Sequence, residues 1–266
     1  MLLLQIVCTL SLAAAAAGCF YQVLLALVAL LPRAAGPLPT DSPDTTFAIV
    51  IPAHNEETVI ADTLRSCAAI DYPADKKTVY VVADNCDDRT AQIAQTAGAT
   101  CLVRTDTQQR GKGQALRWAF DRILPEGPDA VVVLDADSAL ESGSLNAFDR
   151  HLRSGEAVLQ ANSGVANPDD NATSYVLAVA STLENDLFYA PKDRLGMAVL
   201  LQGTGMVLSR RVLLDKLSLR WMDHVVCVSH AQQRKVRRTG VPAGRTTVIH
   251  NAVIAETDTA ARSASA

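Results

Sequence analysis

The stretch Ala130-Val-Val-Val-Leu-Asp-Ala-Asp137 is the most strand-like run of the chain, and it ends in two carboxylates. A short, uninterrupted apolar run is typical of a strand that is buried on both faces of a sheet. Asp135 and Asp137 are two positions apart, so their side chains can point to the same side. The run therefore predicts a strand with an acidic pair at its carboxyl end.

The segments on both sides of this run alternate between strands and helices. We expect strands over residues 47–51, 79–82, 101–103 and 157–160, and helices after Asn55, over residues 89–97, from Gly111 and after Asp137. Asn55 is a good N-cap for the first of these helices, with two glutamates in its first turn. The alternation predicts a mainly parallel α/β sheet with helices on both faces.

Polar residues follow directly after three predicted strands, at Asn55, Asp84 and Asp137. In such a sheet the carboxyl ends of the strands meet at one edge, and ligands bind there. The chain has no GxGxxG after its first strand and no GxxxxGK[ST] segment, and Gly111-Lys-Gly113 is too short to be either. The sequence therefore disfavours a nicotinamide-dependent dehydrogenase and a P-loop enzyme.

The Asp135–Asp137 pair suggests a metal site. Two carboxylates held together repel one another unless a cation or a proton lies between them. Mg²⁺ and Mn²⁺ prefer oxygen ligands, commonly bind substrate phosphates and can neutralise a diphosphate leaving group. The alternative is that Asp137 caps the next helix and that Asp135 is merely solvated.

The N-terminal segment has no charged side chain before Arg33. About 20 apolar residues are enough for a helix to cross a bilayer, so we expect residues 1–33 to be a retained transmembrane anchor. A cleaved signal peptide and a buried core helix are the alternatives; the missing basic n-region and the long apolar run disfavour the former. Arg33 after the segment favours a cytoplasmic position for the globular part.

The overall composition excludes other classes of protein. The chain has 24 Lys and Arg against 28 Asp and Glu, and its net charge of −4 argues against nucleic-acid binding. Its six cysteines form no CxxC pair, so neither a zinc site nor a disulfide framework is indicated. Residues 34–46 contain three prolines and are expected to be a linker.

Four motifs occur in order along the chain, namely Phe47-Ala-Ile-Val-Ile-Pro-Ala-His-Asn-Glu56, Val82-Ala-Asp-Asn-Cys-Asp-Asp88, Arg110-Gly-Lys-Gly-Gln-Ala115 and Val133-Leu-Asp-Ala-Asp137. Together they resemble the family 2 glycosyltransferases, which bind nucleotide sugars with the GT-A fold. Leu200-Leu-Gln-Gly-Thr-Gly-Met206 is similar to the acceptor-side loop of the membrane-associated members. The resemblance implies a GT-A-like, mainly parallel sheet flanked by helices and preceded by a transmembrane helix.

The resemblance also implies a role for individual residues. Those expected to bind substrate are Pro52, Ala53, Asn55, Glu56, Asp84, Lys112, Asp135, Gly203, Thr204 and Gly205. Asp84 would accept hydrogen bonds from the uracil or ribose, Lys112 would lie near the nucleotide or diphosphate, and Asp135 would approach the sugar or ribose. Asp137 would hold Mg²⁺ or Mn²⁺. Each of these positions has a structural alternative. These are a helix cap for Asn55, a turn for Asp84, a solvated side chain for Lys112, and a hairpin or bulge for Gly203 and Gly205.

The sequence departs from the family pattern after Met206. Inverting sugar transfer needs a general base, which the resemblance places in an acidic pair that precedes a Gln-x-x-Arg-Trp motif. No Glu-Asp pair occurs here, and Leu217 stands at the Gln position before Arg220-Trp221. We therefore expect residues 47–218 to be an incomplete domain and assign no catalytic residue.

The C-terminal tail has another pattern. Residues 219–254 have the pattern of a strand, a basic helix and a strand, and they resemble the end of the first domain of the family 4 glycosyltransferases, which have the GT-B fold. Residues 255–266 are expected to be disordered. The tail therefore suggests a fusion or an artefactual join.

These features lead to two competing functions. The first is a single-pass enzyme of the cell membrane, with its globular part in the cytoplasm. It transfers a sugar from a nucleotide-diphosphate sugar, by resemblance a UDP-sugar, to a polysaccharide or lipid-linked acceptor, with inversion. The alternative is an inactive membrane protein that at most binds nucleotide sugar. A sugar nucleotidyltransferase is disfavoured because the chain lacks a Gly-rich pyrophosphate loop near its first strand.

Overall fold

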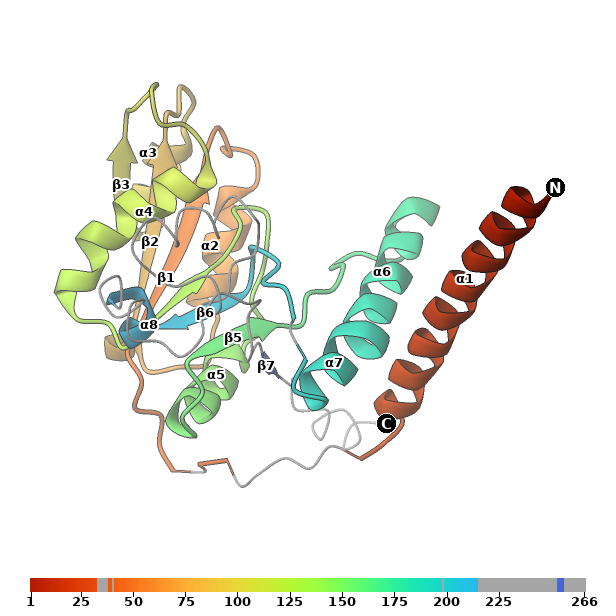
Figure 1. Cartoon of the computed structure of the whole chain (residues 1–266). Helices are drawn as coiled ribbons and strands as arrows, with labels where there is room; N and C mark the ends of the chain where they lie inside the picture. The colour runs from red at the N-terminus through yellow and green to blue at the C-terminus, as the bar shows by residue number, and fades with distance from the viewer. Residues whose placement is uncertain (33–37, 40, 198, 215–252, 256–266) are drawn as a thin grey trace. The chain divides into compact units, whose positions relative to one another are not determined.

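The computed structural model describes residues 1–32, 38–39, 41–197, 199–214 and 253–255 (Figure 1). Two compact units make up the chain. One consists of Met1–Gly36 with Ser163–Val199, and the other of Pro37–Asn162 with Leu200–Ala266. We call the first the helical unit and the second the sheet unit.

The sheet unit is built on seven strands in the order β3-β2-β1-β4-β6-β5-β7. Their bounds are β1 Phe47–Ala53, β2 Lys77–Asp84, β3 Thr100–Arg104, β4 Ala130–Val133, β5 Val158–Ala161, β6 Met206–Ser209 and β7 Val253–Ala255. β1 pairs in parallel with β2 and β4, and β2 pairs in parallel with β3. The mainly parallel α/β sheet expected from the sequence is therefore confirmed, while β6, antiparallel to β4 and β5, was not expected.

Helices cover both faces of this sheet. They are α2 Ile60–Ala68, α3 Thr90–Thr96, α4 Lys112–Ile123 and α5 Ser144–Arg153, with short turns η1 Ala74–Lys76 and η2 Leu124–Glu126 and the short helix α8 Arg210–Leu214. Phe47, Ile49 and Ile51 of β1 share one core with α2, α3 and α5. Ala48 and Val50 share the other core with α4. The alternation along β1 thus divides the apolar residues between two layers of helices.

The prediction that Asn55 caps the first helix after β1 is wrong. α2 begins at Ile60, and Val59 takes its N-cap position. Asn55 has a φ of 58°, a left-handed conformation that asparagine tolerates better than most residues. Its side-chain amide donates to Asp87 Oδ1 at 2.5 Å, and its oxygen accepts from the Asp87 backbone N–H at 2.9 Å. Asn55 therefore joins the loops after β1 and β2.

The helical unit contains α1 Leu2–Ala29, α6 Ala172–Glu184, the π-helix η3 Asn185–Tyr189 and α7 Ala190–Arg194. Among the described helices, α1 alone is long and apolar enough to cross a membrane, a property that signal sequences and core helices of soluble proteins can share. The Arg194 guanidinium donates to the carbonyls of Val28, Ala29 and Leu31 at 3.1, 3.2 and 2.8 Å. Arg194 thereby binds the carbonyls at and just after the end of α1, the group of acceptors that a helix end exposes.

Asp149 of α5 fixes the segment that leads into β1. The carboxylate is 1% exposed, and its Oδ1 accepts from Asp44 N at 3.1 Å, Thr45 N at 2.9 Å and Thr45 Oγ1 at 2.7 Å. Burial raises the pKa of Asp149, but the hydrogen bonds from Thr45, Asp44 and Arg153 together lower it further, so the net pKa lies below its ordinary value. The last residues of the expected linker are therefore bound to the sheet unit.

Asp149→Ala is expected to lower the free energy of unfolding by about 3 kcal/mol, because buried donors that lose their acceptor cost about 1–3 kcal/mol each. Urea unfolding of the full chain in detergent, followed by tryptophan fluorescence, measures this change. Glu141→Ala, which removes an exposed carboxylate just before α5, is the control and should change stability by less than about 0.5 kcal/mol. Equal stability of the two variants would contradict the assignment.

The same interaction has a pH dependence. Because the pKa of Asp149 is lowered in the folded chain, its stabilisation is complete above the unfolded pKa of about 4 and is lost as the pH falls through the folded value. The stability difference between the native chain and Asp149→Asn should therefore shrink on acidification. Urea midpoints measured from pH 7 down to pH 3 test this, and a difference that stays constant would count against it.

Candidate active site

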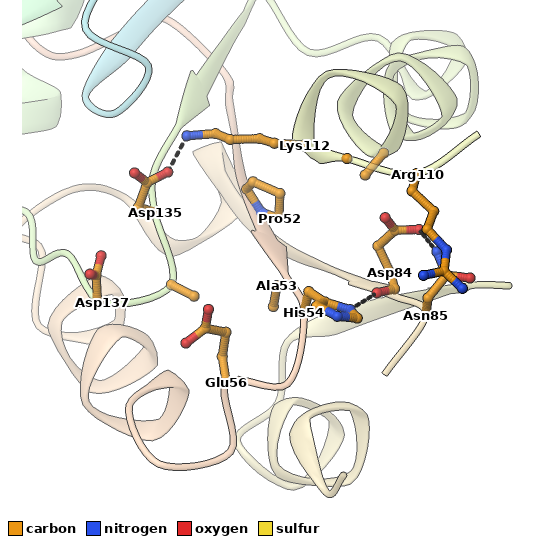
Figure 2. A pocket seen from close by; sticks show the side chains of 13 residues that line it. Pro52, Ala53, His54, Glu56, Asp84, Asn85, Arg110, Lys112, Asp135 and Asp137 are labelled. Atoms are coloured by element: carbon orange, nitrogen blue, oxygen red, sulfur yellow. Dashed lines mark hydrogen bonds and ion pairs between the residues drawn. The ribbon is translucent and has the colours of Figure 1, made fainter. Parts of the chain in front are cut away.

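A cavity of about 370 Å³ lies at the carboxyl ends of β1, β2 and β4 (Figure 2). Its lining residues are Pro52, Ala53, His54, Glu56, Asp84, Asn85, Arg110, Gly111, Lys112, Ala115, Asp135, Ala136 and Asp137. In Figure 2, the carboxylates of Asp135, Asp137 and Glu56 lie toward one side and Asn85 and Arg110 toward the other. The structure thus contains the crevice that the parallel strands predict.

The side of the cavity near β2 is held by a buried arginine. Arg104, 4% exposed, forms ion pairs with Asp84 and Asp106 and donates to the Gln109 carbonyl at 2.6 Å. Asp84 is 7% exposed, and its carboxylate is paired with this buried guanidinium. One guanidinium thus fixes Asp84 together with the loop that leads to Arg110 and Lys112.

Two further contacts complete this side of the cavity. The His54 ring Nδ1 lies 2.7 Å from the Asp84 carbonyl oxygen, so it links the ends of β1 and β2. Asn85, with a φ of 53°, accepts from the Asp106 N–H at 2.8 Å and donates to the Asp106 carbonyl at 3.1 Å. The backbone on this side is therefore held by side-chain hydrogen bonds as well as by the strands.

The opposite side brings Lys112 and Asp135 together with the loop before β6. Lys112 forms an ion pair with Asp135 and donates to the Gly203 carbonyl at 2.7 Å. Thr204 Oγ1 accepts from the Asp135 backbone N–H at 3.0 Å. Gly203 and Thr204 therefore lie next to the cavity although they do not line it. Lys112 is an ion-paired residue and not simply a solvated one.

Gly205 has a structural requirement of its own. Its φ is 63°, and a Cβ atom built on it would lie 2.8 Å from the Ala161 Cβ. Its carbonyl accepts from the Ala161 N–H at 2.8 Å. The nearby Gln160 is 3% exposed, donates to the Thr204 carbonyl at 2.8 Å and accepts from the Gln202 N–H at 2.9 Å. Gly205 and Gln160 thus hold the loop of residues 202–205 against β5.

The carboxylates of Asp135 and Asp137 fit a divalent cation that takes its remaining ligands from a substrate. Both line the cavity, and Asp137 is exposed, with one hydrogen bond of 3.3 Å from Ser138. Within the described part of the chain, no three His, Cys, Asp or Glu side chains are grouped closely enough to hold a metal by themselves. Mg²⁺ is commonly bound by one or two carboxylates, with phosphates and water completing its octahedron. The donor set therefore suits a cation that arrives with a diphosphate.

The expected site residues fall into two groups. Seven line the cavity, namely Pro52, Ala53, Glu56, Asp84, Lys112, Asp135 and Asp137, whereas Asn55 and the three residues Gly203–Gly205 do not. Sequence reasoning missed Asn85 and Arg110 and set His54 aside, although all three lie in the quoted motifs. It also missed Arg104 and Gln160. The one available signal for Arg104 was a charged residue directly after a predicted strand.

Comparison with solved structures supports the fold. The chain is similar to a mannosyltransferase, PcManGT from Pyrobaculum calidifontis, solved in complex with GDP-Man and Mn²⁺. The TM-score is 0.59 at 21% identity, and the match covers 94% of this chain and 68% of the other. The likeness confirms the GT-A-like fold.

Two curated proteins match parts of the sequence. The probable glycosyltransferase YdaM of Bacillus subtilis is 33% identical over 100 residues, which are 35% of this chain and 23% of YdaM. A beta-monoglucosyldiacylglycerol synthase of Trichormus variabilis is 26% identical over 174 residues, 62% of this chain and 36% of that protein. The matched stretches thus span less than two fifths of either relative.

A family model covers most of the chain. The model described as "Glycosyltransferase like family 2" matches residues 43–265. The match includes the tail that was expected to resemble the family 4 enzymes. Most of that tail, residues 215–252, lies outside the described residues, so the family 4 resemblance stays a prediction. The match of the family model and the fold lead to one conclusion: the chain belongs to glycosyltransferase-like family 2.

Proposed function

We propose that this chain is a membrane-anchored glycosyltransferase that uses a nucleoside diphosphate sugar, by resemblance a UDP-sugar. The observation that carries the proposal is the cavity at the strand ends, which has Asp84 on one side and Lys112, Asp135 and Asp137 on another. A nucleoside diphosphate needs a polar group for its base or ribose and cationic groups for its phosphates. Membership of the family and the GDP-Man and Mn²⁺ bound to PcManGT support this assignment.

The cavity residues would act by binding and orienting the donor. Asp84, fixed by Arg104, would accept hydrogen bonds from the base or ribose, and Asp135 would approach the sugar or ribose. Lys112 carries three N–H donors, of which the contacts with Asp135 and Gly203 use two, so one can reach a phosphate oxygen. Asp137, beside Asp135, would hold Mg²⁺ or Mn²⁺, which when bound neutralises charge on the diphosphate.

The transfer joins an acceptor hydroxyl oxygen to the anomeric carbon while the bond from that carbon to the diphosphate oxygen breaks. Family resemblance implies inversion at this carbon and a base that takes the hydroxyl proton. No residue is proposed for that base, since residues 206–214 contain no acid. The acceptor would be a lipid-linked sugar or a polysaccharide, and the similarity to the beta-monoglucosyldiacylglycerol synthase of Trichormus variabilis supports a lipid.

Membrane anchoring by α1 is part of the proposal. The three hydrogen bonds from Arg194 to the end of α1, together with the contacts of η3 and α7 with α1, support a helix that stays with the protein. α1 would cross the membrane once and keep the sheet unit on the cytoplasmic side, as Arg33 favours.

The alternative is a chain that binds nucleotide sugar without transferring it. The missing acidic pair after Met206 favours this possibility, and so would a fused tail similar to family 4 over residues 219–254. Calorimetry separates the two functions. Binding of UDP without any release of UDP from UDP-sugars indicates a binding protein, whereas release indicates an enzyme.

Asp137→Asn is expected to reduce the release of nucleoside diphosphate by about 100-fold, because metal-ion charge stabilisation is worth several kcal/mol in the transition state. Purified full chain in detergent, supplied with UDP- or GDP-sugars, a lipid acceptor and Mn²⁺, provides the assay. Asp75→Asn, in an exposed turn of the sheet unit, is the matched control and should retain full activity. Unchanged release by Asp137→Asn, with its unfolding midpoint preserved, would rule out the proposed metal role.

Arg104→Lys tests whether Arg104 positions Asp84. A lysine keeps the charge but cannot reach Asp84, Asp106 and the Gln109 carbonyl at once as the guanidinium does. We expect the KM for nucleotide sugar to rise by about 10-fold, which is the loss of about one charge-assisted hydrogen bond to the bound substrate. The kcat should stay nearly unchanged, because this bond would be made equally in the ground state and the transition state. Arg89→Lys, at an exposed arginine paired with Glu57 outside the cavity, is the control. Equal KM values for the two variants would contradict the role of Arg104.

A further inference from the structure

Helix α6 of the helical unit exposes its apolar residues. Six large apolar side chains of α6 and η3 are between 38% and 64% exposed, namely Tyr175, Val176, Leu177, Val179, Leu183 and Leu187. Residues 172–183 contain no charged side chain. Positions 175, 179, 183 and 187 recur every four residues, so they form one stripe along the helical segment. We call Tyr175, Val179, Leu183 and Leu187 the α6 stripe.

Two polar residues of this segment, Ser181 and Asn185, face the protein, as does Tyr189. Ser181 Oγ donates to the Ser163 carbonyl, and Asn185 Nδ2 donates to the same carbonyl at 2.8 Å. Asn185 is 4% exposed. A surface helix of a water-soluble domain normally turns its apolar stripe to the core and its polar residues to water. The large apolar residues of α6 instead lie on its exposed side, as is expected where the surroundings are lipid.

The position of this segment in the helical unit also indicates a bilayer. η3 and α7 contact α1, and α7 lies at the carboxyl-terminal end of α1 in Figure 1. Arg194 hydrogen-bonds to the Val28 and Ala29 carbonyls of that end. That end of α1 would lie at the membrane surface if α1 is the anchor. Arg and Lys residues commonly occupy this level of a membrane protein, as Lys192 and Arg194 would. The α6 stripe therefore begins next to the level at which α1 would enter the membrane.

We propose that the α6 stripe rests in the boundary between headgroups and acyl chains, so that the protein contacts the bilayer through α6 as well as through α1. The proposal rests on the membrane anchoring proposed above. α6 continues without a break through η3 and α7 to Arg194, but only its residues 172–183 form a run without charged side chains. That run is too short to span a bilayer, for which about 20 residues are needed. Asp170 and Asn171 precede it and Glu184 ends it. Polar groups at both ends suit a helix that lies along the surface.

Photo-crosslinking in liposomes tests the proposal in the full chain. p-Benzoylphenylalanine replaces Val179, Leu183, Leu12 or Gln95, one position at a time, in vesicles of phosphatidylcholine and phosphatidylglycerol. Leu12 is an exposed residue of α1 and reports anchoring, while Gln95 is an exposed residue of α3 in the sheet unit. After illumination, mass spectrometry identifies whether each probe has joined a lipid or a peptide. We expect lipid adducts at Val179, Leu183 and Leu12 at yields several-fold above that at Gln95.

The possible outcomes are distinct. Lipid adducts at Leu12 but not at Val179 or Leu183 would overturn the contact of α6 with lipid and leave the anchor intact. Adducts at none of these three positions would overturn the anchor and the α6 contact together. Cross-links from Val179 and Leu183 to peptides of the same chain or of a second copy, in place of lipid, would show that protein covers the stripe and would also overturn the proposal. The two α6 positions guard against a single variant that fails to fold.

Discussion

The burial of β1 on both faces is the constraint on which the sheet unit depends. Residues 47–51 are at most 2% exposed, and β1 pairs in parallel with a strand on each edge. Its backbone groups can therefore be satisfied only by β2 and β4, and its side chains only by helices on two sides. As a consequence all three strands end at the same edge. The proposed donor site is the space that these ends leave.

The sequence was informative where a local pattern determines the structure. Uninterrupted apolar runs identified β1, β2 and β4, and six of the seven expected residues that line the cavity lie at or just after the ends of these strands. The seventh, Lys112, begins α4. Non-local contacts were not visible. The Asn55–Asp87 link, the Arg104 ion pairs and the antiparallel β6 each depend on residues that meet only after the chain has folded. A good N-cap residue such as Asn55 can equally stabilise a loop, and only the fold decides between the two.

The helical unit differs from the sheet unit in its apolar pattern. The sheet unit encloses its apolar residues between layers, whereas α1 and α6 expose theirs. In water such exposure would favour aggregation, since large exposed apolar patches are rare on soluble monomers. Composition alone attributed the apolar excess to one anchor and a buried sheet. The structure adds a second exposed segment, which lies between β5 and β6 and had no recognisable motif.

The Lys112–Asp135 ion pair has a consequence for how ligands would enter the cavity. Asp84 is already held by Arg104, so that side is preorganised and would need little rearrangement for a nucleoside. On the other side, a phosphate would have to compete with Asp135 for Lys112. Displacing the lysine would release the Asp135 carboxylate toward Asp137, where a cation would then meet more negative charge. Diphosphate and cation should therefore bind cooperatively, each raising the affinity for the other by the same factor.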